Sequence, residues 1–189
     1  MDGDGRAWLT GHFLIAMPQL ADPNFFHTVT FICEHNEEGA LGLVVNRPSE
    51  MRLGEILEHM GIEGAEAAAR EVPVYVGGPV QRERGFVLHE PVGAWASTLQ
   101  VSERVAITTS RDILEAIARG AGPERYLVAL GYAGWGPGQL EQEMADNAWL
   151  SGPADMRIVF EVPDEAKWEA AARHLGIDLG RLSGEAGHA

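Results

Sequence analysis

The residues best suited to covalent chemistry stand together in one segment, Cys33-Glu34-His35. A thiol beside an imidazole base is the arrangement that cysteine hydrolases use. Side chains alternate across a strand, so Cys33 and His35 are predicted to share one face. At about 3.3 Å of rise per residue their side chains would lie about 6 to 7 Å apart, which is too long for direct contact. A base from elsewhere in the chain would be needed.

Histidines predicted on or beside other strands could supply that base, or the ligands of a mononuclear metal site: His12, His27 and His89. The competing interpretation is structural, because a lone cysteine is usually buried and a strand-end histidine commonly bonds a backbone carbonyl. We favour the structural interpretation and assign no metal and no cofactor. A hydrolase or metal enzyme that uses Cys33 with His35 or His89 is the alternative.

A glycine-rich segment, residues 131–138, lies between a predicted strand and a predicted helix, where phosphate-binding loops also lie. It lacks the Lys-Ser/Thr pair of a nucleotide loop, and Glu141 and Glu143 fall where phosphate would sit. We interpret the segment as a tight connection. Trp135 is then a packing or contact residue, and it could form a binding surface with Gln139 and Glu143.

Carboxylates near these segments could serve acid–base chemistry or hold a divalent ion: Glu34, Glu90, Glu141 and Glu143. Their spacing matches no known pattern. Solvation at the surface is the default for glutamate. Only Glu34 and Glu143 are kept as candidate binding residues.

The balance of acidic and basic side chains indicates whether the protein is suited to bind nucleic acid. The chain has 14 basic and 28 acidic side chains and a formal net charge of −14. Binding to duplex DNA depends on Lys and Arg that neutralise phosphates. No dense basic run exists, only Arg82 with Arg84 and a scattered set at Arg104, Arg111, Arg119 and Arg125. The sequence therefore disfavours direct nucleic-acid binding, which stays a second alternative.

The single cysteine excludes an intramolecular disulfide and a multi-cysteine zinc site. The first residues lack the basic-then-apolar order of a signal peptide, and no apolar run approaches the roughly 18 residues of a membrane span. We expect a cytoplasmic protein with no membrane association.

Short β-rich runs alternate with helical patterns. Strands are expected over residues 12–17, 26–34, 41–46, 72–76, 85–89, 97–101, 104–108, 126–130 and 156–162. The polar segment 35–39 predicts a hairpin turn, since Gly39 can supply a positive φ.

Four helices are expected. The first helix has Ser49 as its N-cap and ends near Gly61. The second begins at a capping box of Thr109 and Asp112. The third begins near Pro137, and the fourth covers residues 164–175. Residues 63–71 could be helical or irregular.

Strands interrupted by helices without regular alternation favour an α+β fold with a mixed, largely antiparallel sheet flanked by helices. No linker divides the chain. We expect one domain over residues 11–176, a flexible N-terminus at residues 1–10 and a frayed tail at residues 177–189.

The order of several segments resembles the AlgH/YqgE family of bacterial proteins, from about Gly11 to Phe160. These segments are FLIAMP (13–18), DPNF (22–25), CEH (33–35), GALGLV (39–44), GGPV (77–80), RGFVLH (84–89), GYAGW (131–135) and GQLE (138–141). Each is weak alone, and their joint order is specific.

The resemblance implies a compact α+β domain whose sheet curls toward a barrel. It implies no catalytic residues, because the family is largely uncharacterised biochemically. Some members are described as transcriptional regulators of alginate synthesis, a label that comes from genetics.

Together these observations favour a non-enzymatic binding or regulatory module that acts on gene expression indirectly. Its partner would be an unknown protein or a small ligand. The candidate binding residues are Cys33, Glu34, His35, His89, Trp135, Gln139 and Glu143.

Overall fold

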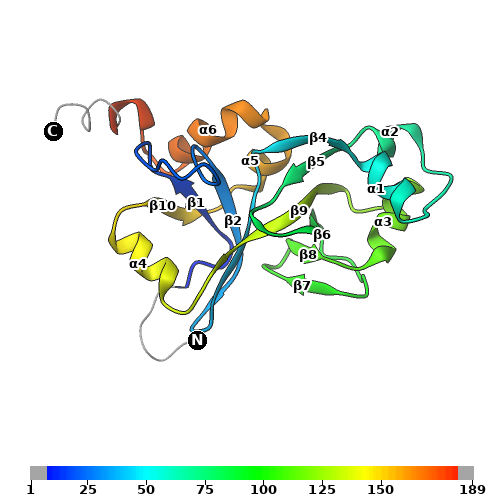
Figure 1. Cartoon of the computed structure of the whole chain (residues 1–189), viewed down its shortest axis with the longest axis horizontal. Coiled ribbons are helices and arrows are strands. Elements are labelled where there is room, and N and C mark those ends of the chain that lie inside the picture. The colour runs from blue at the N-terminus through cyan, green and yellow to red at the C-terminus, as the bar shows by residue number, and fades with distance from the viewer. Residues whose placement is uncertain (1–7, 183–189) are drawn as a thin grey trace.

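Four antiparallel strands form one half of the sheet, in the order β10 (Trp149–Pro153), β1 (His12–Ala16), β2 (Val29–Asn36) and β3 (Gly39–Val44). A computed structural model describes residues 8–182 of the chain (Figure 1). β2 and β3 make the predicted hairpin, with Asn36 opposite Gly39. Gly39 has a φ of 130°, a conformation that side chains other than glycine rarely adopt.

One long strand, β9 (Arg125–Trp135), joins this half of the sheet to the other. Its last residues pair with β3, where Gly42 lies opposite Ala133. Its earlier residues pair antiparallel with β6 (Val80–Glu90) and parallel with β5 (Pro73–Val76). In Figure 1, β9 crosses the middle of the molecule from one half to the other.

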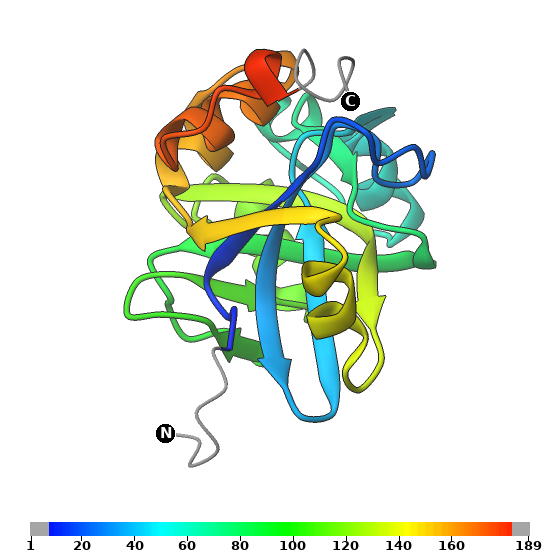
Figure 2. The ribbon, with the colours of Figure 1, turned by 90° about the vertical axis from the view of Figure 1, so that its left-hand side faces the viewer.

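Three short strands complete the sheet. β8 (Ala106–Thr108) pairs with β6, β7 (Thr98–Gln100) pairs with β8, and β4 (Pro48–Arg52) pairs with β5. Figure 2 shows β2 and β3 standing upright across the strands of the other half, so the sheet curls back on itself. The predicted α+β fold with a curled, largely antiparallel sheet is confirmed.

Helices cover both halves. The half that contains β6 and β8 carries α1 (Leu53–His59), α2 (Ala67–Arg70) and α3 (Arg111–Ala118) (Figure 1). The half that contains β1 and β2 carries α4 (Gln139–Ala145), α5 (Met156–Glu161), the 3-10 helix η1 (Asp164–Ala166) and α6 (Lys167–His174). None of these helices is long and apolar enough to cross a membrane.

The buried apolar side chains of residues 8–182 form three clusters. The largest lies between the curled sheet and α5 and α6, and includes Phe13, Phe31, Leu43, Leu88 and Ala171. The second joins α1, α2 and α3 to β5, β6 and β9. The third lies under α4 and contains Trp135, Leu140 and Trp149. The helices α1, α3, α4, α5 and α6 therefore bury apolar side chains against the sheet.

The only lysine of the chain, Lys167, is buried at the start of α6. Its ammonium group lies 2.8 Å from the Asp164 carboxylate and donates to the Val45 carbonyl oxygen at 2.8 Å. The Tyr75 hydroxyl donates to the same carboxylate at 2.7 Å. Burial lowers the pKa of Lys167 and raises that of Tyr75. These contacts tie the C-terminal helices to β5 and to the end of β3.

The last predicted strand, residues 156–162, is wrong: the segment forms α5. A short apolar run fits either structure, and the N-cap decides here, because the Asp155 side chain accepts from the Arg157 N–H. No pattern in the sequence indicates β10, which contains Gly152 and Pro153. Proline is tolerated there because β10 is an edge strand.

The predicted glycine-rich connection at residues 131–138 is mostly wrong as well, because β9 continues to Trp135. Within it, Gly131 is buried against the backbone of Gly78. Gly131 has a φ of 79°, and a side chain at Gly78 would collide with the backbone of Tyr132.

The predicted helix starts also need correction. Ser49 lies in β4, where its hydroxyl donates to the Val74 carbonyl oxygen, and Arg52 is the N-cap of α1. Ser110, not Thr109, is the N-cap of α3, and α4 starts after Gly138, so Pro137 is outside the helix.

Packing extends past residue 176, the predicted domain boundary. Leu179 is buried, and Ile177 and Leu182 pack against the largest cluster. Residues 1–7 of the predicted flexible N-terminus and residues 183–189 of the predicted tail lie outside the described part of the chain.

Candidate functional site

Cys33 and His35 do not share a face of β2, which corrects the prediction. A bulge shifts the register between Ile32 and Glu34, so two residues of β2 stand against one step of β3. Cys33 packs with Phe31 in the largest cluster, whereas His35 faces α4 on the other side of the strand. Burial raises the pKa of the Cys33 thiol. A thiol that is buried and protonated is a poor nucleophile.

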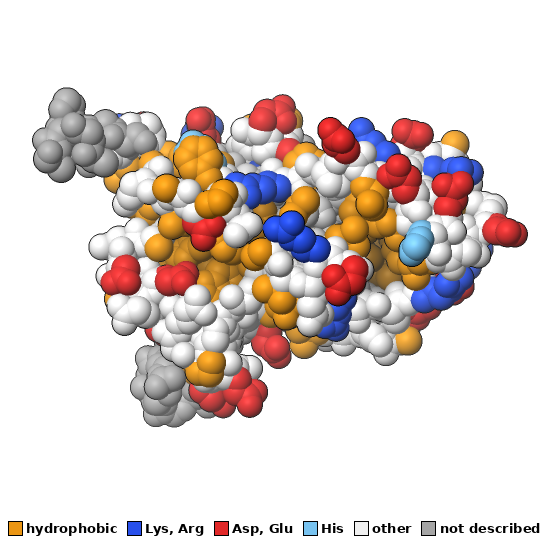
Figure 3. Space-filling view, in the orientation of Figure 1, with side chains coloured by type: hydrophobic (Ala, Val, Ile, Leu, Met, Phe, Trp, Pro, Cys, Tyr) orange, Lys and Arg blue, Asp and Glu red, His pale blue; other side chains and the backbone are white. Residues whose placement is uncertain are grey.

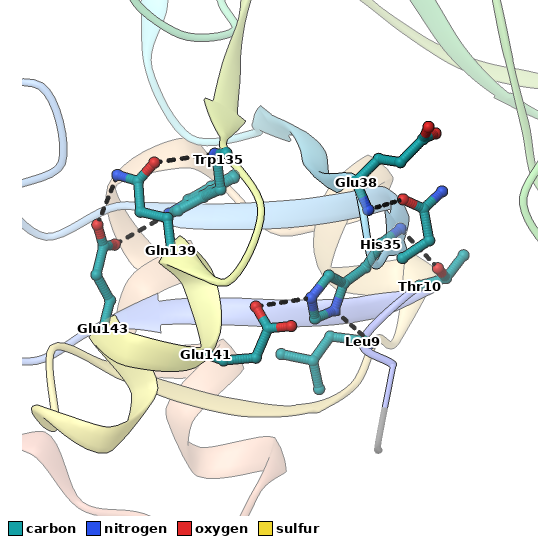
Figure 4. A network of polar contacts seen from close by, with 10 residues as sticks. Leu9, Thr10, His35, Glu38, Trp135, Gln139, Glu141 and Glu143 are labelled. Atoms are coloured by element: carbon teal, nitrogen blue, oxygen red, sulfur yellow. Dashed lines mark hydrogen bonds and ion pairs between the residues drawn. The ribbon is translucent and has the colours of Figure 1, made fainter. Parts of the chain in front are cut away.

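His35 is a structural histidine that joins the N-terminal segment to β2 (Figure 4). Its Nδ1 accepts the Leu9 N–H at 3.0 Å, and its backbone N–H donates to the Thr10 hydroxyl at 3.0 Å. Because Nδ1 is an acceptor, the ring proton is on Nε2, which lies 3.4 Å from a Glu141 carboxylate oxygen. The Trp8 ring packs edge-on against the imidazole, with the two ring centroids 4.9 Å apart.

His89 is fully buried in β6, in a separate chain of hydrogen bonds. Its Nδ1 lies 3.0 Å from the Pro91 carbonyl oxygen, which can only accept, so the ring proton is on Nδ1. Nε2 therefore accepts from the Thr108 hydroxyl at 2.7 Å, and that hydroxyl accepts in turn from Thr98 at 2.8 Å. Burial lowers the pKa of His89. The imidazole is held neutral as part of the core.

Glu34 is exposed on β2 and lines a shallow open depression with Asn36 and Glu38. Glu90 forms an ion pair with Arg125 at 3.5 Å. Within residues 8–182, no group of three or more His, Cys, Asp or Glu side chains is arranged to hold a metal ion. The structure thus places the candidate residues of β2 and β6 in separate surroundings.

The structure does bring Trp135, Gln139 and Glu143 together (Figure 4). One Glu143 oxygen accepts the indole N–H groups of Trp135 and Trp149, each at 3.0 Å, and the other accepts from Gln139 at 3.0 Å. The Gln139 side-chain oxygen accepts the Gly136 N–H at 3.0 Å. Trp135 is only 6% exposed. This network fastens α4 to the sheet and leaves little of the indole for a partner.

A cleft lies in the other half of the molecule, where the sequence indicated no site. Its volume is about 600 Å³, within the usual range for small-molecule pockets. The walls come from α1, the first turn of α3 and the strands β6 and β9. Apolar side chains dominate them, among them Ile56, Phe86, Val87, Leu114, Val128 and Leu130. Figure 3 shows hydrophobic side chains at the bottom of a hollow in the right half of the molecule.

Polar groups stand around this apolar floor. Glu55 and His59 come from α1, Glu83 from β6, and Arg111 from the start of α3. The Arg111 guanidinium donates to the Met60 carbonyl oxygen at 2.7 Å and so joins α3 to the end of α1. An apolar pocket with a few polar groups at its edge is the common form of a ligand site.

The cleft has no signature in the sequence because four separate segments build it. They lie at residues 51–60, 83–87, 108–114 and 128–130. Each contributes ordinary core or surface residues. The one available signal was the apolar periodicity of the segment that forms α1, and that pattern indicates packing as readily as binding.

Comparisons with known proteins agree with this fold. The sequence model of the AlgH-like family matches residues 13–180. A UPF0301 protein of Thioalkalivibrio sulfidiphilus is 64% identical over 180 residues, which cover 95% of this chain and 96% of that protein. A UPF0301 protein of Nitrosococcus oceani is 58% identical over 182 residues, which cover 96% and 97%.

Two solved structures are similar. The solution structure of the AlgH protein from Pseudomonas aeruginosa has a TM-score of 0.80 and 51% identity, with 97% of each chain covered. The crystal structure of a protein from Corynebacterium diphtheriae has a TM-score of 0.73 with 97% and 94% covered, and at 20% identity it shows a shared fold alone. The chain belongs to the AlgH-like family, whose curated members are named UPF0301 proteins.

Proposed function

We propose that this protein is a binding module and that its ligand enters the cleft between α1, α3 and β6. The observation that carries the proposal is the cleft itself, which has a volume of about 600 Å³, is lined mostly by apolar side chains and is open to solvent. An exposed apolar concavity with a few polar groups at its edge is typical of a site that takes up a small ligand.

The residues that could have made an enzyme support a binding role instead. The Cys33 thiol is buried with a raised pKa, and its sequence neighbour His35 faces away from it. Both nitrogens of His89 are engaged with Pro91 and Thr108. None of the three lines the cleft.

The proposal includes an indirect effect on gene expression, without contact to DNA. Several arginines that could meet phosphate are occupied within the protein. Arg47 donates to three carbonyl oxygens, Arg111 pairs with Glu115, and Arg125 pairs with Glu90 and Glu161. With a net charge of −14, the chain is poorly suited to a polyanion. A cytoplasmic location is part of the same proposal.

The cleft can be tested by filling it. Gly85 lines the cleft, and a Cβ placed there would meet only a Leu130 methyl group, at 3.9 Å. Gly85→Leu should therefore fold and occupy the space. Gly136→Leu is the matched control, because a Cβ at Gly136 also meets a single atom at 3.9 Å and lies outside the cleft.

The probe is N-phenyl-1-naphthylamine, an uncharged apolar dye that fluoresces when it leaves water. The wild type and Gly136→Leu should bind one dye per chain, and Gly85→Leu should bind it at least about tenfold more weakly, as expected for a loss of about 1.4 kcal/mol. Equal binding by all three proteins, or no binding by the wild type, would overturn the proposal.

A further inference from the structure

At the mouth of the cleft, the positive charge of Arg111 has an ion-pair partner within the protein, whereas the two nearby carboxylates have none in the described part of the chain. The Arg111 guanidinium is neutralised within the protein, since its Nε lies 3.1 Å from a Glu115 carboxylate oxygen. Its Nη1 is also engaged with the Met60 carbonyl. The charge of Arg111 is therefore compensated by Glu115, so this residue adds no unpaired positive charge at the mouth.

Two carboxylates at the mouth lack such compensation. Glu55, on α1, accepts the Arg52 N–H at 3.0 Å, a helix-capping contact with a neutral donor. Glu83, on the facing strand β6, is exposed. Neither forms an ion pair with any residue in the range 8–182. Negative charge thus stands on two walls above an apolar floor.

We propose that the cleft binds an organic cation: a small molecule with an apolar alkyl or aryl body that lies on the floor and an ammonium group at the mouth. This inference rests on the proposed function and adds the chemistry of the ligand. Glu55 and Glu83 are both exposed, and their two negative charges attract a cationic head group at the mouth. A carboxylate on the same apolar body would be repelled by the same two groups.

Three probes with one body and different head groups test the charge preference: octylamine, octanol and octanoate. Each is titrated against the wild type at pH 8, above the range in which histidine ordinarily titrates. Binding is followed by the amide chemical shifts of Gly85 and Leu114, which line the cleft. Octylammonium should bind at least about tenfold more tightly than octanol, and octanoate more weakly than octanol.

Salt and substitution give independent readouts. Added salt should weaken the binding of octylammonium and leave that of octanol unchanged. The double variant Glu55→Gln, Glu83→Gln should bind the two equally, and Gln at position 55 keeps the capping acceptor. Glu165→Gln, an exposed glutamate of η1 that does not line the cleft, should preserve the preference.

The outcomes separate the two claims. Equal affinity of the wild type for all three probes, or tighter binding of octanoate, would overturn the cation preference and leave the cleft as a binding site. Failure of every probe to shift the cleft amides would overturn the proposed function together with the inference.

Discussion

The ammonium group of Lys167 and the carbonyl oxygen of Val45 lie 2.8 Å apart, although 122 residues separate them in the chain. This contact crosses from the first turn of α6 to the loop that leaves β3. A buried ammonium group needs such partners, because desolvation of an unpaired charge costs several kcal/mol. The Asp164 carboxylate supplies the opposite charge.

Removal of this ammonium group should destabilise the fold. Lys167→Met leaves Asp164 without its cation and the Val45 carbonyl without a donor, so the free energy of unfolding should fall by about 3 kcal/mol. Arg173→Met, at an exposed position of the same helix, should change it by less than about 0.5 kcal/mol. Urea denaturation measures both. A Lys167→Met protein as stable as the control would show that the buried pair contributes no net stability.

Stability should decrease on acidification. Burial lowers the pKa of His89 from its ordinary 6.5, so below that pH the unfolded chain takes up a proton that the folded protein does not. Stability is then fully present above about pH 6.5 and declines below it. Burial shifts His12 and His27 in the same direction. Urea titrations at a series of pH values should give a shallower decline for His89→Gln; an unchanged slope would contradict this account.

The Glu143 carboxylate should be hard to replace. In Glu143→Gln the remaining oxygen can still accept the two indole N–H groups, but an NH2 group replaces the oxygen that accepts from Gln139, so two donors face each other and the Gln139 contact is lost. We expect a loss of about 1 to 3 kcal/mol. Glu141→Gln, on the same helix, disturbs only the 3.4 Å contact with His35 and should cost much less. Thermal unfolding followed by tryptophan fluorescence compares them, and equal melting temperatures would rule out the network as an anchor of α4.

The Cys33 thiol should be unreactive in the folded protein. It is 1% exposed and burial raises its pKa, so a disulfide-exchange reagent should label it only after unfolding in urea. Ala121→Cys places a thiol at an exposed position and should react at once, with one equivalent per chain. Rapid labelling of the native wild type would show that the Cys33 thiol is accessible and would support the alternative of a hydrolase that uses Cys33.

Elements that depend on local sequence were predictable. The β2–β3 hairpin follows from a polar turn that ends at Gly39, and α6 follows from the 3.6-residue spacing of Trp168, Ala171 and Ala172. β10 was not predictable, because its stability comes from pairing with β1, where Pro153 lies opposite His12. No local pattern contains a partner that far away.

The candidate site was predicted poorly for a similar reason. Chemical residue types drew attention to Cys33, His35 and His89, and the fold uses each of them for packing or for hydrogen bonds to its own backbone and hydroxyls. A single bulge in β2 was enough to separate the first two. The cleft instead depends on the curvature of the sheet and on the position of α1, which only the assembled chain determines.

The path of β9 has a consequence for how the protein comes apart. Val128 of this strand belongs to the cluster under α1 and α3, Leu127 and Ala129 belong to the largest cluster, and Ala133 and Trp135 belong to the cluster under α4. If any one cluster loses its order, β9 is displaced, and the other two clusters lose the side chains that β9 contributes to them. The molecule should melt in a single cooperative step, and neither half should persist as a separate folded fragment after proteolysis within β9.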